Sequence, residues 1–122
     1  MKILLSSLFV CLTLTVLNAQ NANTAICGTK ESLIKVVQSG LIELTLPENI
    51  SKSDVEKYGS YYKNSFSISF DEKSHLATIK MVENTSNNRR VILRFLSANQ
   101  IQNVVVEDKS FLVNDFYENF LK

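Results

Sequence analysis

Residues 65–82, SFSISFDEKSHLATIKMV, decide the fold because they hold two strand patterns separated by a turn. In the first half, three large apolar residues alternate with serines, which is the period-two pattern of a strand with one buried face. A polar run over 71–74 follows, and a second apolar run covers 76–82. The stretch therefore predicts a β-hairpin whose apolar face must be covered by other parts of the chain.

The segment before the hairpin begins with a second apolar region. Residues 41–46 are rich in Leu and Ile and stop at Pro47, which predicts a strand that ends there. Residues 33–39 allow two interpretations. They are either a strand paired with 41–46 or a short helix closed by Gly40.

A helix is predicted between this strand and the hairpin, over residues 54–63. Ser53 and Glu56 have the spacing of a capping box, in which the hydroxyl and the carboxylate satisfy two free amides. Apolar residues then follow at helical spacing. Gly59 weakens this helix by roughly 1 kcal/mol.

Three more elements are predicted after the hairpin. Residues 89–100 carry apolar residues on one helical face, and we favour a helix there over a strand across 91–96. Residues 104–106 are three valines and predict a short buried strand. Asn114 and Asp115 can cap a last helix that carries Phe116, Phe120 and Leu121.

The resulting order predicts an α+β fold. It resembles the ferredoxin-like split β-α-β arrangement (βαββαβ), an antiparallel sheet with both helices on one face, here with an added C-terminal helix. Over residues 41–107 the order is similar to the heavy-metal-associated domains of copper chaperones. That family carries a Cys-x-x-Cys pair between its first strand and first helix, but residues 47–53 contain no sulfur. The resemblance therefore implies the fold and no metal site.

The N-terminus has the pattern of a secretory signal peptide. Lys2 precedes an apolar run over 3–17, which is shorter than the roughly 20 residues that span a bilayer. We predict cleavage after Ala19, with Ala22 as second choice, and export to the periplasm or the medium, with no membrane span in the mature chain. A Gln20 start and a Trp-free, Asn/Lys-rich remainder resemble exported bacterial proteins of the Bacteroidota.

If the signal peptide is cleaved, the chain divides into three segments. We predict a signal peptide over 1–19, a flexible leader over 20–32 and a single domain over 33–122. Cys11 would be removed with the signal peptide, so Cys27 has no partner in its own chain. It is either buried, free or paired with another molecule.

Composition excludes several classes of function. The chain has 13 Lys+Arg against 12 Asp+Glu, a net charge of +1, which gives no reason to expect nucleic acid as a partner. Two Cys and one His are too few for a zinc module. Asp71, Glu72 and His75 could hold an ion or form a catalytic pair, but a solvated turn is the interpretation we favour. No catalytic motif is present, so we expect neither catalysis nor a cofactor.

Two clusters are candidate binding residues. All three arginines lie close together, at Arg89, Arg90 and Arg94, and predict a weak carboxylate or phosphate site. Their alternative role is ordinary surface charge paired with acids.

The second cluster consists of three tyrosines in the predicted helix: Tyr58, Tyr61 and Tyr62. One helical face cannot bury all three, so at least one phenol should face solvent, where it could contact a partner. The alternative is packing on the sheet and its rim.

Together these observations predict a small exported module that binds through its surface and does not catalyse a reaction. Its expected partner is another envelope or secreted protein. The alternative is a protease inhibitor or propeptide-like domain, in which residues 20–29 or the last residues would enter a protease cleft.

Overall fold

The computed structural model describes residues 23–122, so the predicted signal peptide lies outside the described residues. The described chain forms a six-stranded mixed sheet with the strand order β3-β4-β2-β1-β5-β6. The elements are β1 (Thr24–Cys27), α2 (Lys30–Ser39), β2 (Leu41–Thr45), α3 (Lys52–Ser60), β3 (Phe66–Asp71), β4 (Leu76–Met81), α4 (Ser86–Ala98), β5 (Asn103–Val106), β6 (Lys109–Leu112), α5 (Val113–Phe116) and the π-helical turn η1 (Tyr117–Leu121).

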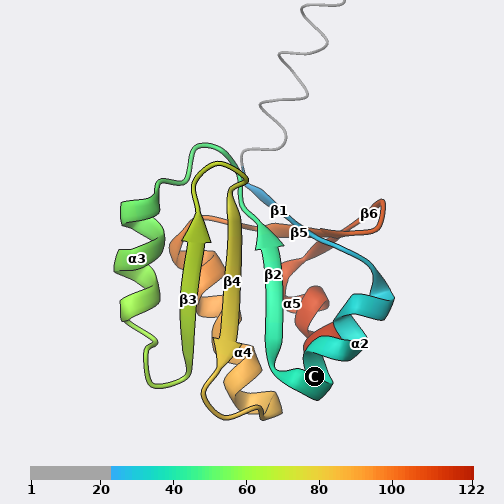
Figure 1. Ribbon diagram of the computed structural model, residues 1–122. Helices are drawn as coiled ribbons and strands as arrows, with labels where there is room; N and C mark the ends of the chain where they lie inside the picture. Colours follow the sequence, from blue (N-terminus) through green and yellow to red (C-terminus); the bar gives the residue numbers. More distant parts are fainter. Residues whose placement is uncertain (1–22) are drawn as a thin grey trace, which may run out of the picture.

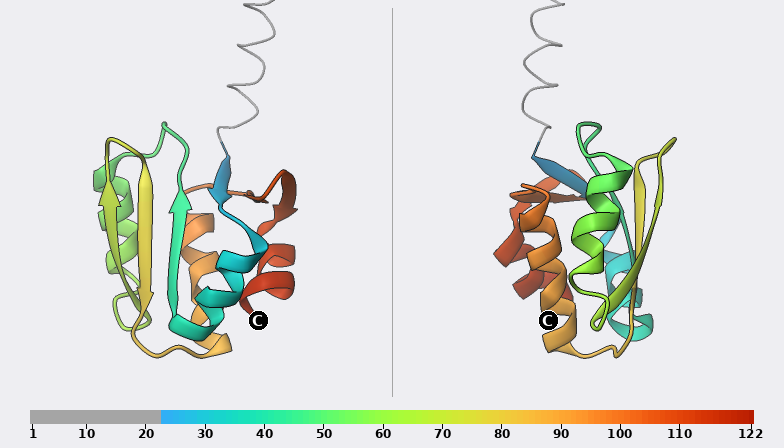
Figure 2. Two further views of the ribbon diagram at one scale, coloured as in Figure 1. Left: turned by 45° about the vertical axis from the view of Figure 1, so that its right-hand side comes forward. Right: turned by 90° about the vertical axis from the view of Figure 1, so that its left-hand side faces the viewer.

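The sheet consists of two halves that run across each other. Strands β3, β4 and β2 lie side by side, whereas β1, β5 and β6 cross their direction (Figure 1). A single residue pair, Ile26 with Thr45, joins β1 to β2. The helices α3, α4 and α5 lie on one side of β3 and β4 (Figure 2). The fold is therefore a strongly twisted sheet with a helical layer on one face.

The α+β class is confirmed, but the ferredoxin-like strand order is not. Strand β1 lies between β2 and β5 and runs parallel to β5, so the sheet is mixed where an antiparallel one was predicted. Strand β6, which the sequence analysis missed, pairs with β5 through a two-residue turn at Glu107 and Asp108. Glu107 has a φ of 59°, which such a tight turn requires.

The prediction of a flexible leader over 20–32 is wrong for its described part. Thr24–Cys27 form β1, in which Ala25 and Cys27 point into the core. Residues 33–39, which the sequence allows as either a strand or a helix, belong to α2. This helix begins with a capping box between Thr29 and Ser32. It ends at Gly40, whose φ of 73° is left-handed.

The predicted hairpin is confirmed by β3 and β4, which pair in register from Phe66 with Met81 to Asp71 with Leu76. The helix predicted over 54–63 is present as α3, but its cap is wrong. Ser51, and not Ser53, accepts a hydrogen bond from the amide of Asp54 at 3.2 Å. The helix therefore begins two residues earlier than the sequence pattern indicated. It also ends three residues earlier, at Ser60, so Tyr61 and Tyr62 follow the helix.

Gly59 has a packing role that outweighs its low helix propensity. A Cβ at this position would lie 2.5 Å from Cγ2 of Ile68, closer than any real contact. The missing side chain therefore lets α3 pack directly on β3.

The helix predicted over 89–100 is present as α4 and begins earlier, because Thr85 accepts a hydrogen bond from the amide of Asn88 at 3.2 Å. The predicted C-terminal helix is formed by α5 and η1, which place Phe116 and Leu121 in the core. Its predicted capping by Asn114 and Asp115 is wrong, because α5 already begins at Val113 and has no side-chain cap. Within residues 23–122, none of the helices combines the length and apolarity needed to cross a bilayer.

Candidate functional site

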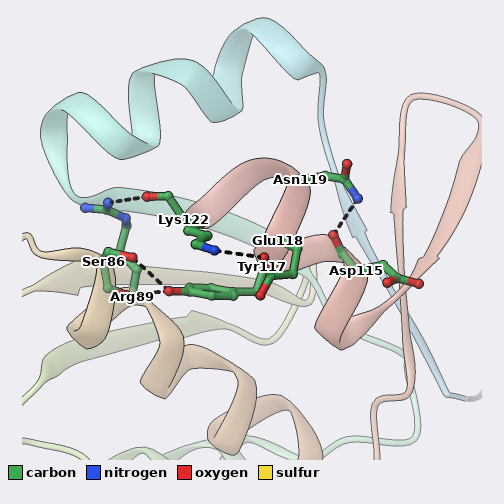
Figure 3. A network of polar contacts seen from close by, with 7 residues as sticks. All are labelled: Ser86, Arg89, Asp115, Tyr117, Glu118, Asn119 and Lys122. Atoms are coloured by element: carbon green, nitrogen blue, oxygen red, sulfur yellow. Dashed lines mark hydrogen bonds and ion pairs between the residues drawn. The ribbon is translucent and has the colours of Figure 1, made fainter.

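The three arginines of α4 do not form one site, because Arg89 is buried. Its side chain is 5% exposed. Nε donates a hydrogen bond to the main-chain oxygen of Leu121 at 2.6 Å. Nη2 donates to the main-chain oxygen of Lys122 at 3.2 Å (Figure 3). Nη1 donates to the side-chain oxygen of Asn84. Arg89 thus fastens the C-terminal segment to α4, and its inclusion in the predicted anion site is wrong.

Arg90 and Arg94 lie one turn apart on the exposed side of α4 and line a groove of about 540 Å³. The remaining lining residues are Asn87, Val91, Leu93, Ser97 and Asn114. We call this groove the arginine hollow. The structure therefore brings two of the three predicted arginines together, beside carboxamide and hydroxyl groups that can also donate hydrogen bonds.

Neither arginine of the arginine hollow forms an ion pair with a described residue. Between residues 23 and 122 the one ion pair joins Lys122 to Glu118. No acidic residue lines the hollow, and α4 carries none in its first turn. The guanidinium of Arg90 lies 5.6 Å from the ring centre of Tyr117, a cation–π contact that orients it without cancelling its charge.

This arrangement costs local stability. Arg90 and Arg94 lie beyond the first turn of α4, where a cation would oppose the helix dipole, but like charges one turn apart repel each other by a few tenths of a kcal/mol. Two forked guanidinium groups at adjacent turns match the geometry of a carboxylate or a phosphate. The hollow can therefore bind an anion and can hold it by two-point contact.

A second groove, of about 730 Å³, continues from the first, because Ser97 and Asn114 line both. We call it the apolar hollow, because Ile101, Leu112 and Val113 contribute to its wall. Its polar lining residues are Asn23, Gln100, Gln102 and Asp115. Neither hollow is enclosed by the core, and both lie in the size range of ligand pockets.

The tyrosine cluster is separate from both hollows, since none of its members lines them. Tyr61 is 62% exposed, whereas Tyr58 and Tyr62 pack against the core. The ring of Tyr61 lies edge-on to both neighbours, at 5.8 and 6.4 Å between centres. One phenol therefore faces solvent, as the sequence required, and its role as a partner contact stays a prediction.

The side chains of Asp71 and His75 form no hydrogen bond with each other among the described residues, so the hairpin turn does not bring them together as an acid–base pair. The carboxylate of Asp71 accepts hydrogen bonds from the amide of Lys73 at 3.3 Å and from the hydroxyl of Ser74 at 2.8 Å. The ring of His75 lies edge-on to Phe70, 5.4 Å between centres. Among residues 23–122, no three His, Cys, Asp or Glu side chains gather closely enough to hold a metal ion.

Cys27 is buried, which decides between the alternatives left open for it. Its side chain is 2% exposed, and burial raises the pKa of the thiol to about 12. The neutral thiol is a poor nucleophile and is inaccessible to another chain. Intermolecular pairing of Cys27 therefore requires partial unfolding.

Comparison with known proteins adds no relative. No family model matches the chain. No curated protein shows significant similarity to it. No solved structure matches it significantly either. The geometry of the grooves is thus the basis for any functional conclusion.

The sequence pattern predicts Arg90 and Arg94 as site residues but gives no sign of the other residues that line the two hollows. Asn114 comes from α5 and Leu112 from β6, which are distant from α4 in sequence. Their approach to Ser97 depends on how the C-terminal segment folds back. The sequence does indicate that the arginines lack a partner on their own helix, because no acidic residue follows Arg90 or Arg94 at a spacing of three or four residues.

Proposed function

We propose that this protein is a small, exported, non-catalytic binding module that binds an anionic group in the arginine hollow. The observation that carries the proposal is the pair Arg90 and Arg94, which share one groove with no acidic residue in its lining. Two cations one turn apart that repel each other and have no acidic partner in their groove are explained most simply by an external anion. Export itself rests on the signal-peptide pattern of residues 1–19.

The test is an NMR titration of the protein with phosphate, acetate and citrate at constant ionic strength. We expect saturable shifts of the backbone amides of Asn87, Arg90, Arg94 and Asn114, with dissociation constants on the order of 1 mM. Linear, non-saturating shifts spread over all surface lysines would contradict the proposal, because they report general ionic screening.

The alternative of a protease inhibitor receives no support from the fold. An inhibitory tail must be extended and accessible, but Thr24–Cys27 is an interior strand that pairs with both β2 and β5. The C-terminal turn η1 packs on α4 and is fastened through Arg89. The described parts of both candidate tails are thus part of the folded domain.

We also propose that the fold is an elaborated form of the ferredoxin-like arrangement. The segment from β2 to β5 follows the element order βαββαβ. The insertion of β1 between its first and last strands supports an elaborated version of that arrangement.

A further inference from the structure

The two hollows are larger together than a simple anion needs. The arginine hollow alone has a volume of about 540 Å³, and the apolar hollow adds a second compartment that shares Ser97 and Asn114 with it. A phosphate or acetate bound to Arg94 would leave the apolar hollow unfilled. The two adjoining hollows therefore have room for a longer ligand with an anion at one end.

The apolar hollow offers a surface for an apolar side chain. Ile101 is buried in its wall, and Leu112 is 60% exposed at its edge. Leu112 pairs with Asn103 in the β5–β6 hairpin, so its position is held by the sheet. An exposed leucine on a rigid strand beside a hollow is a suitable contact for an incoming aliphatic group.

The polar residues of the groove have unused hydrogen-bonding groups. The side chains of Gln100, Gln102 and Asn114 form no hydrogen bond with any described residue, whereas those of Asn88, Asn99 and Asn119 each donate to a main-chain oxygen. A carboxamide offers a donor and an acceptor, and so does each residue of an extended backbone. Carboxamides along a groove therefore favour a peptide over a hydrocarbon or an inorganic ion.

The charges give the groove a direction. Arg90 and Arg94 lie in one hollow, and Asp115 lines the other. The carboxylate of Asp115 accepts no hydrogen bond from the part of the chain that the structure describes; it is the main-chain oxygen of Asp115 that Asn119 bonds, at 2.8 Å. A complementary ligand carries its acid at the end near the arginines.

From these features we infer that the groove binds an extended segment of a partner protein, with an acidic side chain on Arg90 and Arg94 and an apolar side chain against Ile101 and Leu112. This inference rests on the proposed anion binding and adds the class of ligand. The amides of Gln100, Gln102 and Asn114 hold the backbone between the two side chains.

The test uses blocked peptides in which a glutamate and a leucine are separated by one, two or three glycines. Each is titrated into the full mature chain and followed by NMR, beside two matched peptides with glutamine for glutamate or serine for leucine. We expect the best-spaced peptide to bind about tenfold tighter than either matched peptide. Its amide shifts should cover both hollows, from Arg94 to Val113.

A matched pair of variants separates the two claims. L112S should weaken the best peptide about tenfold and leave phosphate binding unchanged, because Leu112 lines the apolar hollow alone. R94Q should weaken both ligands. Leu112 is largely exposed, so its replacement should leave the fold intact, which circular dichroism checks.

Several outcomes would overturn the inference. Equal binding of the leucine and serine peptides, with shifts confined to 87–97, would leave an anion site and remove the peptide. Tighter binding of citrate than of every peptide would assign a small-molecule ligand. Concentration-dependent shifts of groove amides without peptide would assign the groove to a second copy of the chain. If the unmodified protein bound neither the peptides nor phosphate, the proposed anion binding would be refuted together with this inference.

Discussion

Arg89 and Arg94 lie on the same helix, five residues apart, yet their surroundings are opposite. Arg89 is buried and donates to three oxygen atoms from Asn84, Leu121 and Lys122. Arg94 is exposed and lines a groove without a partner among residues 23–122. Both carry the same charge, so the difference comes from position on the helix.

The comparison separates stability from binding within one element. The polar groups on the inner side of α4 form hydrogen bonds with the C-terminal segment. Ser86 also takes part, because it is hydrogen-bonded to the hydroxyl of Tyr117 (Figure 3). The outer side keeps its guanidinium groups available to solvent. Substitutions on the two sides should therefore have opposite consequences: a large loss of stability on the inner side and a loss of binding on the outer side.

The largest effect on stability is expected from Arg89→Met. The substitution keeps an apolar stem but removes every donor, which leaves the main-chain oxygen of Leu121 buried without a partner. We expect the free energy of unfolding to fall by about 3 kcal/mol. Urea denaturation followed by circular dichroism measures it, and a loss below about 1 kcal/mol would contradict the fastening role of Arg89.

A smaller effect is expected from Tyr117→Phe. Its hydroxyl lies 2.8 Å from the hydroxyl of Ser86 and donates to the main-chain oxygen of Ser86 at 3.3 Å. Removing it should lower the free energy of unfolding by about 1 kcal/mol and leave anion binding unchanged. The same denaturation series gives the first quantity, and a phosphate titration gives the second.

Arg90 contacts Tyr117 of the C-terminal segment and also lines the arginine hollow, so Arg90→Gln should affect both stability and anion binding. It removes the contact with the ring of Tyr117, which costs about 0.5 kcal/mol of stability at an exposed site. It should also weaken phosphate binding several-fold. Unchanged binding in this variant would restrict the anion site to Arg94.

Arg94→Gln should have the smallest effect on stability and a full effect on binding. Its side chain has no partner in the described chain, so the free energy of unfolding should change by less than about 0.5 kcal/mol. A clear loss of stability would instead place Arg94 with Arg89 in the structural group. Denaturation and titration of the same sample distinguish these results.

Much of the fold could be predicted because the apolar pattern is strong. The hairpin of β3 and β4 alternates cleanly, and α4 carries a continuous apolar face, so both were found. Strand β1 was missed because it has only four residues and follows a polar stretch. Its burial comes from pairing with β2 and β5, which no local pattern reveals.

The site could be predicted only in part, and for a related reason. The clustering of Arg90 and Arg94 is visible in the sequence, but the burial of Arg89 depends on the return of η1 over α4. One residue along a helix is a rotation of about 100°, so neighbours in sequence face different surroundings. Leu112 and Asn114 entered the site through tertiary packing alone.

The most direct measurement compares two variants with the same change in net charge. R90Q/R94Q removes two cations from the groove, and K73Q/K80Q removes two exposed cations that do not line it. Phosphate titration by NMR should show a loss of affinity of about tenfold or more in the first variant and nearly unchanged affinity in the second. Equal loss in both would contradict a specific site, since binding would then follow net charge alone.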